Sequence, residues 1–255
     1  MGKKFSINTK KLAETLLYSI VPPLLVIFLW QLCANFNLLN SKICPTPKNV
    51  IGAFFSLLKK GIIQKDIVAS FGRIIKGYIE GASLGLLTGI LLGLNEKADR
   101  ATKTLIGFFR PIPVMALVPF FILWLGIGEK SKVALIALGT FWSVMVNTTA
   151  GIKNVDKKLI EVAELLDKSK LIIITKVILP AAKPFIITGL RLGSSSALAC
   201  VVVTEMFAAS RGIGFRMSFA REMAQPDVMF VGVFVISICG ALIDYIFLAI
   251  QSKQK

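Results

Sequence analysis

The chain contains no histidine, and it has only four cysteines and 14 acidic residues among its 255 residues. The commonest side-chain general base and the commonest metal ligand are therefore both missing. The cysteines Cys33, Cys44, Cys200 and Cys239 show neither a pairing pattern nor the spacing of a metal site. The carboxylates are scattered along the sequence. These absences argue against an enzyme, a membrane-embedded enzyme included, and we predict no catalytic or metal site.

Hydrophobic residues make up 55% of the sequence, and its mean hydropathy is +0.75. A soluble domain is about 45–50% apolar, and here the excess is gathered into runs with few or no charges. A membrane-spanning helix needs roughly 20 such residues. We therefore predict an all-α membrane protein with one transmembrane domain over residues 1–255. Its six spans are predicted near residues 16–36, 70–94, 105–126, 132–152, 184–209 and 228–250.

The formal net charge of +16 would suggest a nucleic-acid partner if the protein were soluble. Here the lysines and arginines lie mostly between the predicted spans, where they orient the chain and contact anionic lipid headgroups. We therefore predict contact with membrane lipid and no binding of nucleic acid. The modest bias of these charges predicts that both termini and the loop 153–180 face the cytoplasm. The first apolar run is too long for a cleaved signal peptide.

Five glycines recur every four residues in the second predicted span. They are Gly77, Gly81, Gly85, Gly89 and Gly93. This spacing places them along one stripe of a helix, and small residues let helix backbones approach closely in lipid. Two interpretations remain open. The stripe can serve packing within one chain, or it can have a functional role as a homodimer seam or as a sliding surface that lets helices move.

Three prolines, Pro111, Pro113 and Pro119, fall in the third predicted span and predict a bent axis. The bent helix either packs in the bundle or lies beside a solute pathway. Two charges in the fifth apolar run, Arg191 and Glu205, are further pathway candidates, because charges within a span usually face the bundle interior. Both could instead snorkel to the membrane surfaces. An anionic solute would prefer Arg191, and Glu205 would oppose it unless it serves as a gate partner.

The segment after the first span predicts a short surface helix. Thr46 is a candidate N-cap, Pro47 suits the first turn, and Gly61 suits the end. Its predicted apolar face consists of Val50, Ile51, Phe54, Leu57 and Leu58. We expect this face to lie along the membrane surface.

The charged stretch from Lys153 to Pro180 lies between apolar spans and must face water. Its apolar residues Val155, Leu159, Val162 and Leu166 follow the 4, 3 and 4 spacing of an amphipathic helix. Such a helix either covers its own bundle, which periodicity alone favours, or inserts into a groove on a soluble partner.

Within this stretch, Glu161-Val162-Ala163 is followed after three residues by Asp167 and after nine more by Val177-Ile178-Leu179-Pro180. The spacing resembles the EAA loop of ABC importer permeases, which reads Glu-Ala-Ala, three residues, Gly, nine residues, Ile-x-Leu-Pro. Segments 70–94, 110–132 and 201–217 resemble one branch of that family, the permeases of nitrate, sulfonate and taurine importers. The resemblance covers roughly residues 45–245.

The resemblance implies a six-helix bundle of the type I importer kind, in the inner membrane of a prokaryote, with a cytoplasmic coupling helix between spans 4 and 5. The implied ATPase-coupling residues are Glu161, Val162, Ala163, Leu166, Asp167 and Pro180. Implied partners are cytoplasmic ABC ATPase subunits, a second permease copy forming a homodimer, and an extracytoplasmic solute-binding protein. ATP and Mg²⁺ would bind the ATPase, since this chain has no G-x-x-x-x-G-K-[ST] motif.

Two positions depart from the pattern, because Val162 replaces an alanine and Asp167 replaces the glycine. We interpret both as variation matched by the partner ATPase, with weakened coupling as the alternative. The resemblance implies a sulfonate, taurine or nitrate as solute, although similar permeases also serve thiamine-precursor pyrimidines and riboflavin. An ion-coupled secondary transporter, which needs no ATPase, is a further alternative, but the sequence shows no convincing internal repeat.

Overall fold

The computed structural model describes residues 9–36, 40 and 43–252, and between residues 9 and 20 it describes only the side chain of Tyr18. Every regular element in these ranges is helical. The helices are α1 (Thr9–Asn35), α2 (Pro47–Lys59), α3 (Ile62–Leu94), α4 (Glu96–Phe109), α5 (Val114–Leu125), α6 (Glu129–Lys153), α7 (Lys157–Leu165), α8 (Lys170–Ile173), α9 (Leu179–Ala208), α10 (Ile213–Glu222) and α11 (Pro226–Ser252). A π-helical segment, Ile174–Ile178, joins α8 to α9.

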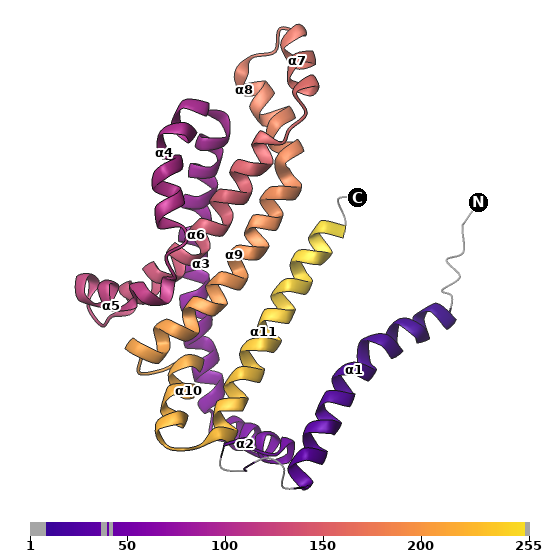
Figure 1. Ribbon diagram of the computed structural model, residues 1–255, viewed down its shortest axis with the longest axis vertical. Helices are drawn as coiled ribbons and strands as arrows, with labels where there is room; N and C mark the ends of the chain where they lie inside the picture. The colour runs from indigo at the N-terminus through magenta and orange to yellow at the C-terminus, as the bar shows by residue number, and fades with distance from the viewer. Residues whose placement is uncertain (1–8, 37–39, 41–42, 253–255) are drawn as a thin grey trace.

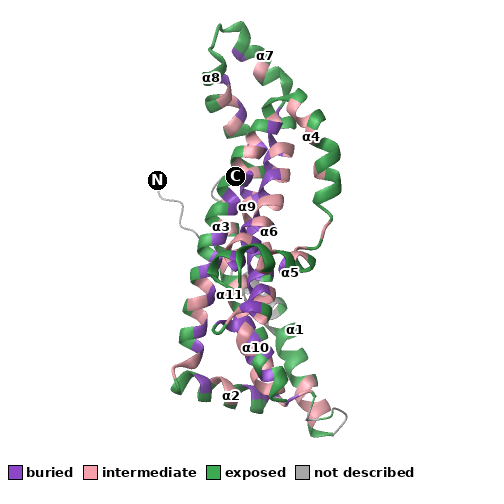
Figure 2. Cartoon of the chain, turned by 90° about the vertical axis from the view of Figure 1, so that its left-hand side faces the viewer, coloured by how far each residue is buried: buried purple, intermediate pink, exposed green. Residues whose placement is uncertain are grey.

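Three long helices, α3, α6 and α9, lie side by side and form the centre of an elongated bundle (Figure 1). Buried residues run along these three helices, whereas α4 has none and α5 has only Val118 (Figure 2). Helices α7 and α8 lie at one end of the bundle, and α2 and α10 lie at the other (Figure 1). We refer to these as the α7 end and the α10 end.

The glycine stripe of α3 faces α6 of the same chain. A Cβ atom added at any of the five glycines would come within 3.0 Å of an atom of α6. The α6 residues at those positions are Ile136, Ala137, Val144, Thr148 and Ile152. Because α6 covers this face, it does not provide a seam between two copies. We call this contact the glycine seam.

Helix α9 approaches an adjacent face of α6 through glycines that the sequence did not single out. A Cβ at Gly189 would lie 2.8 Å from the Cβ of Asn147, and one at Gly193 would lie 3.0 Å from Val144. Gly139 and Gly151 of α6 face Cys200 and Phe185 of α9 in the same way. Helix α6 is therefore packed closely on two sides, and its position depends on both neighbours.

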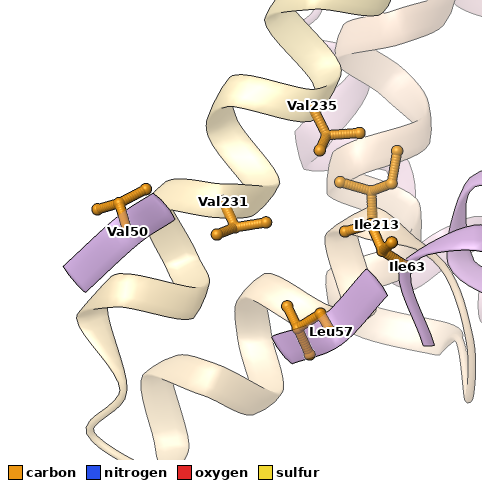
Figure 3. Packing of buried hydrophobic residues seen from close by; sticks show 6 residues of the cluster. All are labelled: Val50, Leu57, Ile63, Ile213, Val231 and Val235. Carbon is orange, nitrogen blue, oxygen red and sulfur yellow. The ribbon is translucent and has the colours of Figure 1, made fainter. Parts of the chain in front are cut away.

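Helix α2 has the boundaries that its sequence predicts. The Thr46 side chain accepts a hydrogen bond from the Asn49 amide at 3.2 Å, Pro47 is the first residue, and Gly61 adopts a left-handed φ of 66°. Val50 and Leu57 are buried in a cluster that joins α2 to its neighbours at the α10 end (Figure 3). The other buried members are Ile63, Ile213, Val231 and Val235. Ile51 and Leu58 stay exposed.

Four helical segments of the described chain are long and apolar enough to cross a membrane. They are α3, α6, the continuous stretch Lys170–Ala208 and α11 through Gln251. Three of the predicted spans, 70–94, 132–152 and 228–250, lie within them, and a fourth, 184–209, extends one residue beyond Ala208. The first predicted span, 16–36, falls on α1, but the side chains of residues 16, 17, 19 and 20 lie outside the description. The prediction that both termini face the cytoplasm concerns residues 1–8 and 253–255, which also lie outside the described residues.

The third predicted span, 105–126, is not one continuous helix. Helices α4 and α5 meet at a bend of 93°, and only as a pair do they qualify as a fifth span. Pro111 and Pro113 lie in the break, whereas Pro119 lies inside α5. Proline removes a backbone donor and disfavours a helical conformation at the residue before it, so two prolines so close together stop the helix.

The glycine seam predicts a position-specific effect of side-chain size. We expect Gly81→Val to destabilise the protein by about 1–3 kcal/mol, because its Cβ would overlap the Ala137 backbone. Gly72→Val in the same helix is the matched control, since a Cβ there meets nothing within 4 Å. Thermal unfolding of the purified protein in detergent measures both. Equal unfolding temperatures for the two variants would contradict the close approach of α3 to α6.

Candidate functional site

Glu205 is fully buried near the α10 end of α9, with an exposed fraction of 0%. Its carboxylate accepts hydrogen bonds from the Arg73 guanidinium at 2.7 Å, the Ser70 hydroxyl at 2.9 Å and the Gly214 amide at 2.9 Å. The alternative that Glu205 snorkels to the membrane surface is therefore wrong. A carboxylate with three donors is held as a structural anion, because burial without partners would cost several kcal/mol.

Further ion pairs extend from this carboxylate. Arg73 also donates two hydrogen bonds to Glu129 at the start of α6, at 2.7 and 2.8 Å, and Lys132 binds the same glutamate at 2.9 Å. Asp66 pairs with Arg216 of α10 at 2.8 Å. We call these residues, with Ser70 and Glu205, the ionic cluster. It fixes α3, α6, α9 and α10 to one another.

The turn between α9 and α10 approaches the ionic cluster through its backbone. Gly212 has a φ of 131°, a conformation that favours glycine, and its amide donates to Asp66 at 3.2 Å. A Cβ at this position would overlap the Glu205 carboxylate. The run Arg211-Gly212-Ile213-Gly214 is therefore shaped around buried acids from α3 and α9.

The second charge singled out from the fifth run, Arg191, pairs with Asp244 of α11. Its guanidinium forms two hydrogen bonds with that carboxylate, one of them at 2.7 Å. The two side chains are 30% and 39% exposed. Arg191 therefore ties α9 to α11, and neither it nor Glu205 lines the cleft described next.

A cleft of about 540 Å³ lies between α5, α6 and α9. Its polar lining consists of Arg110, Ser143, Asn147, Ser196 and Thr204. The hydroxyls of Ser143 and Ser196 share a hydrogen bond of 3.1 Å across the α6–α9 contact. Apolar side chains, including Val114, Met115 and Trp142, complete the walls. None of the described residues that line the cleft is acidic.

The pathway candidates Pro111 and Pro113 do not line the cleft themselves, but they alternate with residues that do, Arg110, Ile112 and Val114. The prolines thus mark the break that brings Arg110 to the cleft. Sequence reasoning missed Arg110, Ser143 and Ser196, because no local pattern brings three separate helices together. The only local signal was an arginine immediately before the proline-rich stretch.

At the other end of the bundle, Asp156 caps α7 by accepting a hydrogen bond from the Lys158 amide at 2.9 Å. Asp167 follows with a left-handed φ of 49°, at the position where the EAA pattern has glycine. Aspartate tolerates this conformation better than most residues, so the turn keeps its form without glycine. The Asp167 amide donates to the Glu164 carbonyl at 2.9 Å and closes the helix.

Most apolar side chains of α7 point away from the bundle. Ala163 is 7% exposed and packs inward, as does Val155 just before the helix. The exposed fractions of Leu159, Val162, Leu165 and Leu166 are 50%, 56%, 83% and 62%. Glu161 and Glu164 are exposed beside them, and Pro180 lies in the first turn of α9. The coupling candidates are therefore gathered at one tip of the molecule.

Comparison with known proteins gives consistent results. The model of a family described as "binding-protein-dependent transport system inner membrane component" matches residues 81–255. The chain is 36% identical to an aliphatic sulfonates transport permease protein (SsuC) of Bacillus subtilis, over 87% of this chain and 80% of that protein. It is 31% identical to the taurine transport system permease protein TauC of Escherichia coli, over 88% and 83% of the two chains.

The fold also resembles a solved structure. A chain of the inward-facing MetNI methionine ABC transporter superposes with a TM-score of 0.67 at 18% sequence identity. The match covers 77% of this chain and 98% of that one. At this identity the likeness concerns the fold alone.

The ionic cluster predicts unequal costs for two glutamates. We expect Glu205→Ala to destabilise the protein by about 3–5 kcal/mol, because it removes one of the two carboxylates that pair with Arg73 and leaves the Ser70 hydroxyl and the Gly214 amide without this acceptor. Glu96→Ala removes an exposed pair with Arg100, whose side chains are 77% and 76% exposed, and should cost about 0.5 kcal/mol or less. Thermal unfolding in detergent compares the two. Similar losses would show that the cluster does not stabilise the α10 end.

Proposed function

Because the chain belongs to the family of binding-protein-dependent transport system inner membrane components, the permease subunits of ABC importers, we propose that α7 is its coupling helix. Through α7, ATP hydrolysed on a separate cytoplasmic ATPase would move the solute-binding walls of a multi-pass membrane protein. The observation that carries this proposal is the exposed apolar surface of α7 at the tip of the bundle.

The exposure of α7 favours a partner over self-packing. Periodicity alone favoured a helix that covers its own bundle, but only Ala163 among the α7 residues is buried. The helix presents an exposed apolar surface formed by Val162, Leu165 and Leu166. The exposed carboxylates of Glu161 and Glu164 flank this surface. Exposed apolar surface of this kind marks an interaction site, and a groove on a soluble partner would remove it from water.

The connections of α7 support transmission of force to the cleft. A buried cluster at the α7 end joins α6, α7, α8 and α9, and its members are Ile152, Val155, Ala163, Ile173, Ile178 and Ala182. Helices α6 and α9 continue from this cluster to form two walls of the cleft. A displacement of α7 would therefore move both walls together, as in a packed two-state bundle that a partner biases.

We infer the rest of the assembly from the family and from the uncovered surfaces. Two ATPase subunits would bind ATP and Mg²⁺ and dock at the α7 end, so that α7 and both termini would lie in the cytoplasm. A binding protein would deliver solute at the α10 end. A second copy of this chain would cover α5, whose side chains Met115, Leu123 and Trp124 are 61%, 79% and 69% exposed.

The solute class follows from the relatives. The similar permeases named above serve transport of aliphatic sulfonates and of taurine, and these compounds share a sulfonate group. We therefore propose a small sulfonate as the solute. Nitrate, thiamine-precursor pyrimidines and riboflavin rest on the resemblance of sequence motifs alone. Membership of the family displaces the ion-coupled secondary transporter that the sequence left open.

Reversing one charge on α7 tests the coupling proposal. We expect Glu161→Lys to abolish or strongly reduce co-purification of the ATPase in detergent, because a cation would meet a surface complementary to a carboxylate. Glu222→Lys, an exposed glutamate at the C-terminal end of α10, is the matched control and should retain the ATPase. If both variants retain the ATPase equally and keep its coupling to transport, Glu161 does not lie at the interface.

A further inference from the structure

Arg110 lies in the break between α4 and α5, where it lines the cleft. Its backbone amide closes α4 by donating to the Ile106 carbonyl at 3.0 Å. Among the hydrogen bonds and ion pairs of the described residues, its guanidinium has none. The arginines that face other helices, Arg73, Arg191 and Arg216, are each paired with a carboxylate.

Arg110 is exposed at the break of a helix pair that is apolar enough to span a membrane, and a charge at such a position usually faces the bundle interior or a water-filled cavity. Arg110 faces a cleft lined by no described carboxylate, so no residue of that wall neutralises it. By contrast, Glu205, Asp66 and Asp244 are already held by other arginines. The charge of Arg110 is therefore available to a ligand that enters the cleft.

The remaining polar groups of the cleft suit an oxyanion. The Ser143 and Ser196 hydroxyls share one hydrogen bond and keep one hydrogen between them, whereas the Thr204 hydroxyl already donates to the Val201 carbonyl at 3.0 Å. Asn147 keeps one amide hydrogen beyond the one it donates to the Ser143 carbonyl at 2.8 Å. A guanidinium offers a fixed fork of donors that matches a tetrahedral oxyanion through two hydrogen bonds. Hydrogen-bond donors thus line the cleft, from Arg110 at one edge to the polar side chains where α6 contacts α9.

Apolar side chains define the other part of the ligand. Met115, Trp142, Val146 and Val203 line the cleft together with Leu192. The volume of about 540 Å³ lies within the range of small-molecule sites. A ligand with a compact anionic head and a short aliphatic body would satisfy both parts of the lining.

We propose that this cleft is the solute site within the membrane and that Arg110 binds the sulfonate group of the solute. The inference deepens the proposed function and rests on it. The body of the solute lies against Trp142 and Met115, while Ser143 and Ser196 donate to the sulfonate as it moves along the α6–α9 contact. Helix α5 and the α4–α5 break carry Arg110 with them when the walls of the cleft move.

The test combines binding and uptake. Binding of radiolabelled ethanesulfonate is measured on the purified permease–ATPase complex without binding protein, and uptake is measured with binding protein in proteoliposomes. We expect Arg110→Gln to weaken binding by about tenfold or more, and Arg110→Lys to weaken it less, because lysine keeps the charge but loses the fork. Lys103→Gln removes an exposed cation of α4 outside the cleft and should bind like the wild type.

Two readouts separate a contact with solute from a structural role. Co-purification of the ATPase should be unchanged in Arg110→Gln. Neutral ethanesulfonamide should compete poorly with ethanesulfonate in the wild type, and Arg110→Gln should lose this discrimination. An arginine that held only a lipid phosphate would change neither the binding nor the discrimination.

Each contrary outcome has a distinct meaning. If the wild-type complex imports ethanesulfonate but Arg110→Gln binds it within twofold of the wild type, Arg110 is not the anion contact. If the wild-type complex imports it but shows no binding without the binding protein, the cleft is not the solute site. If the wild-type complex imports neither ethanesulfonate nor taurine, the proposed solute class is wrong, and the inference is wrong with it.

Discussion

The close approach of α3 to α6 along five glycines is the constraint on which the rest of the structure depends. Without side chains on that stripe, the α3 backbone lies against Ile136, Ala137 and Thr148 of α6. In lipid, where apolar surfaces gain nothing from avoiding water, such close packing supplies the attraction between helices. The glycine seam places Arg73 beside Glu129 and Glu205, and it holds α6 where α9 can pack on an adjacent face.

The two ends of the bundle are built differently. At the α10 end, buried ion pairs with matched donors fix four helices, and breaking such a pair is far more costly than losing a surface pair. At the α7 end, a short capped helix leaves its leucines exposed and is joined to α6 and α9 through a small apolar cluster. The cleft lies between the fixed α10 end and the exposed α7 end, the arrangement that the proposed coupling role of α7 requires.

The sequence could predict the features that depend on residues close together in the chain. The cap at Thr46, the left-handed turn at Gly61 and the apolar runs that became α3, α6, α9 and α11 depend on neighbouring residues only. The partners of Glu205 depend instead on which helix faces meet, since Ser70 and Arg73 are 135 and 132 residues away. For the same reason, neither the ion pair of Arg191 with Asp244 nor the position of Arg110 in the cleft could be predicted. The prolines indicated a bend in the third span, but not that it breaks into two helices.

The source of energy for uptake tests the central claim most directly. The chain, its ATPase and its binding protein are reconstituted in proteoliposomes, and accumulation of labelled ethanesulfonate is measured with and without ATP while ion gradients are imposed or collapsed. We expect accumulation only when ATP and the ATPase are both present, and no change when the ion gradients are collapsed. Accumulation driven by an ion gradient in the absence of the ATPase would contradict a permease driven through α7.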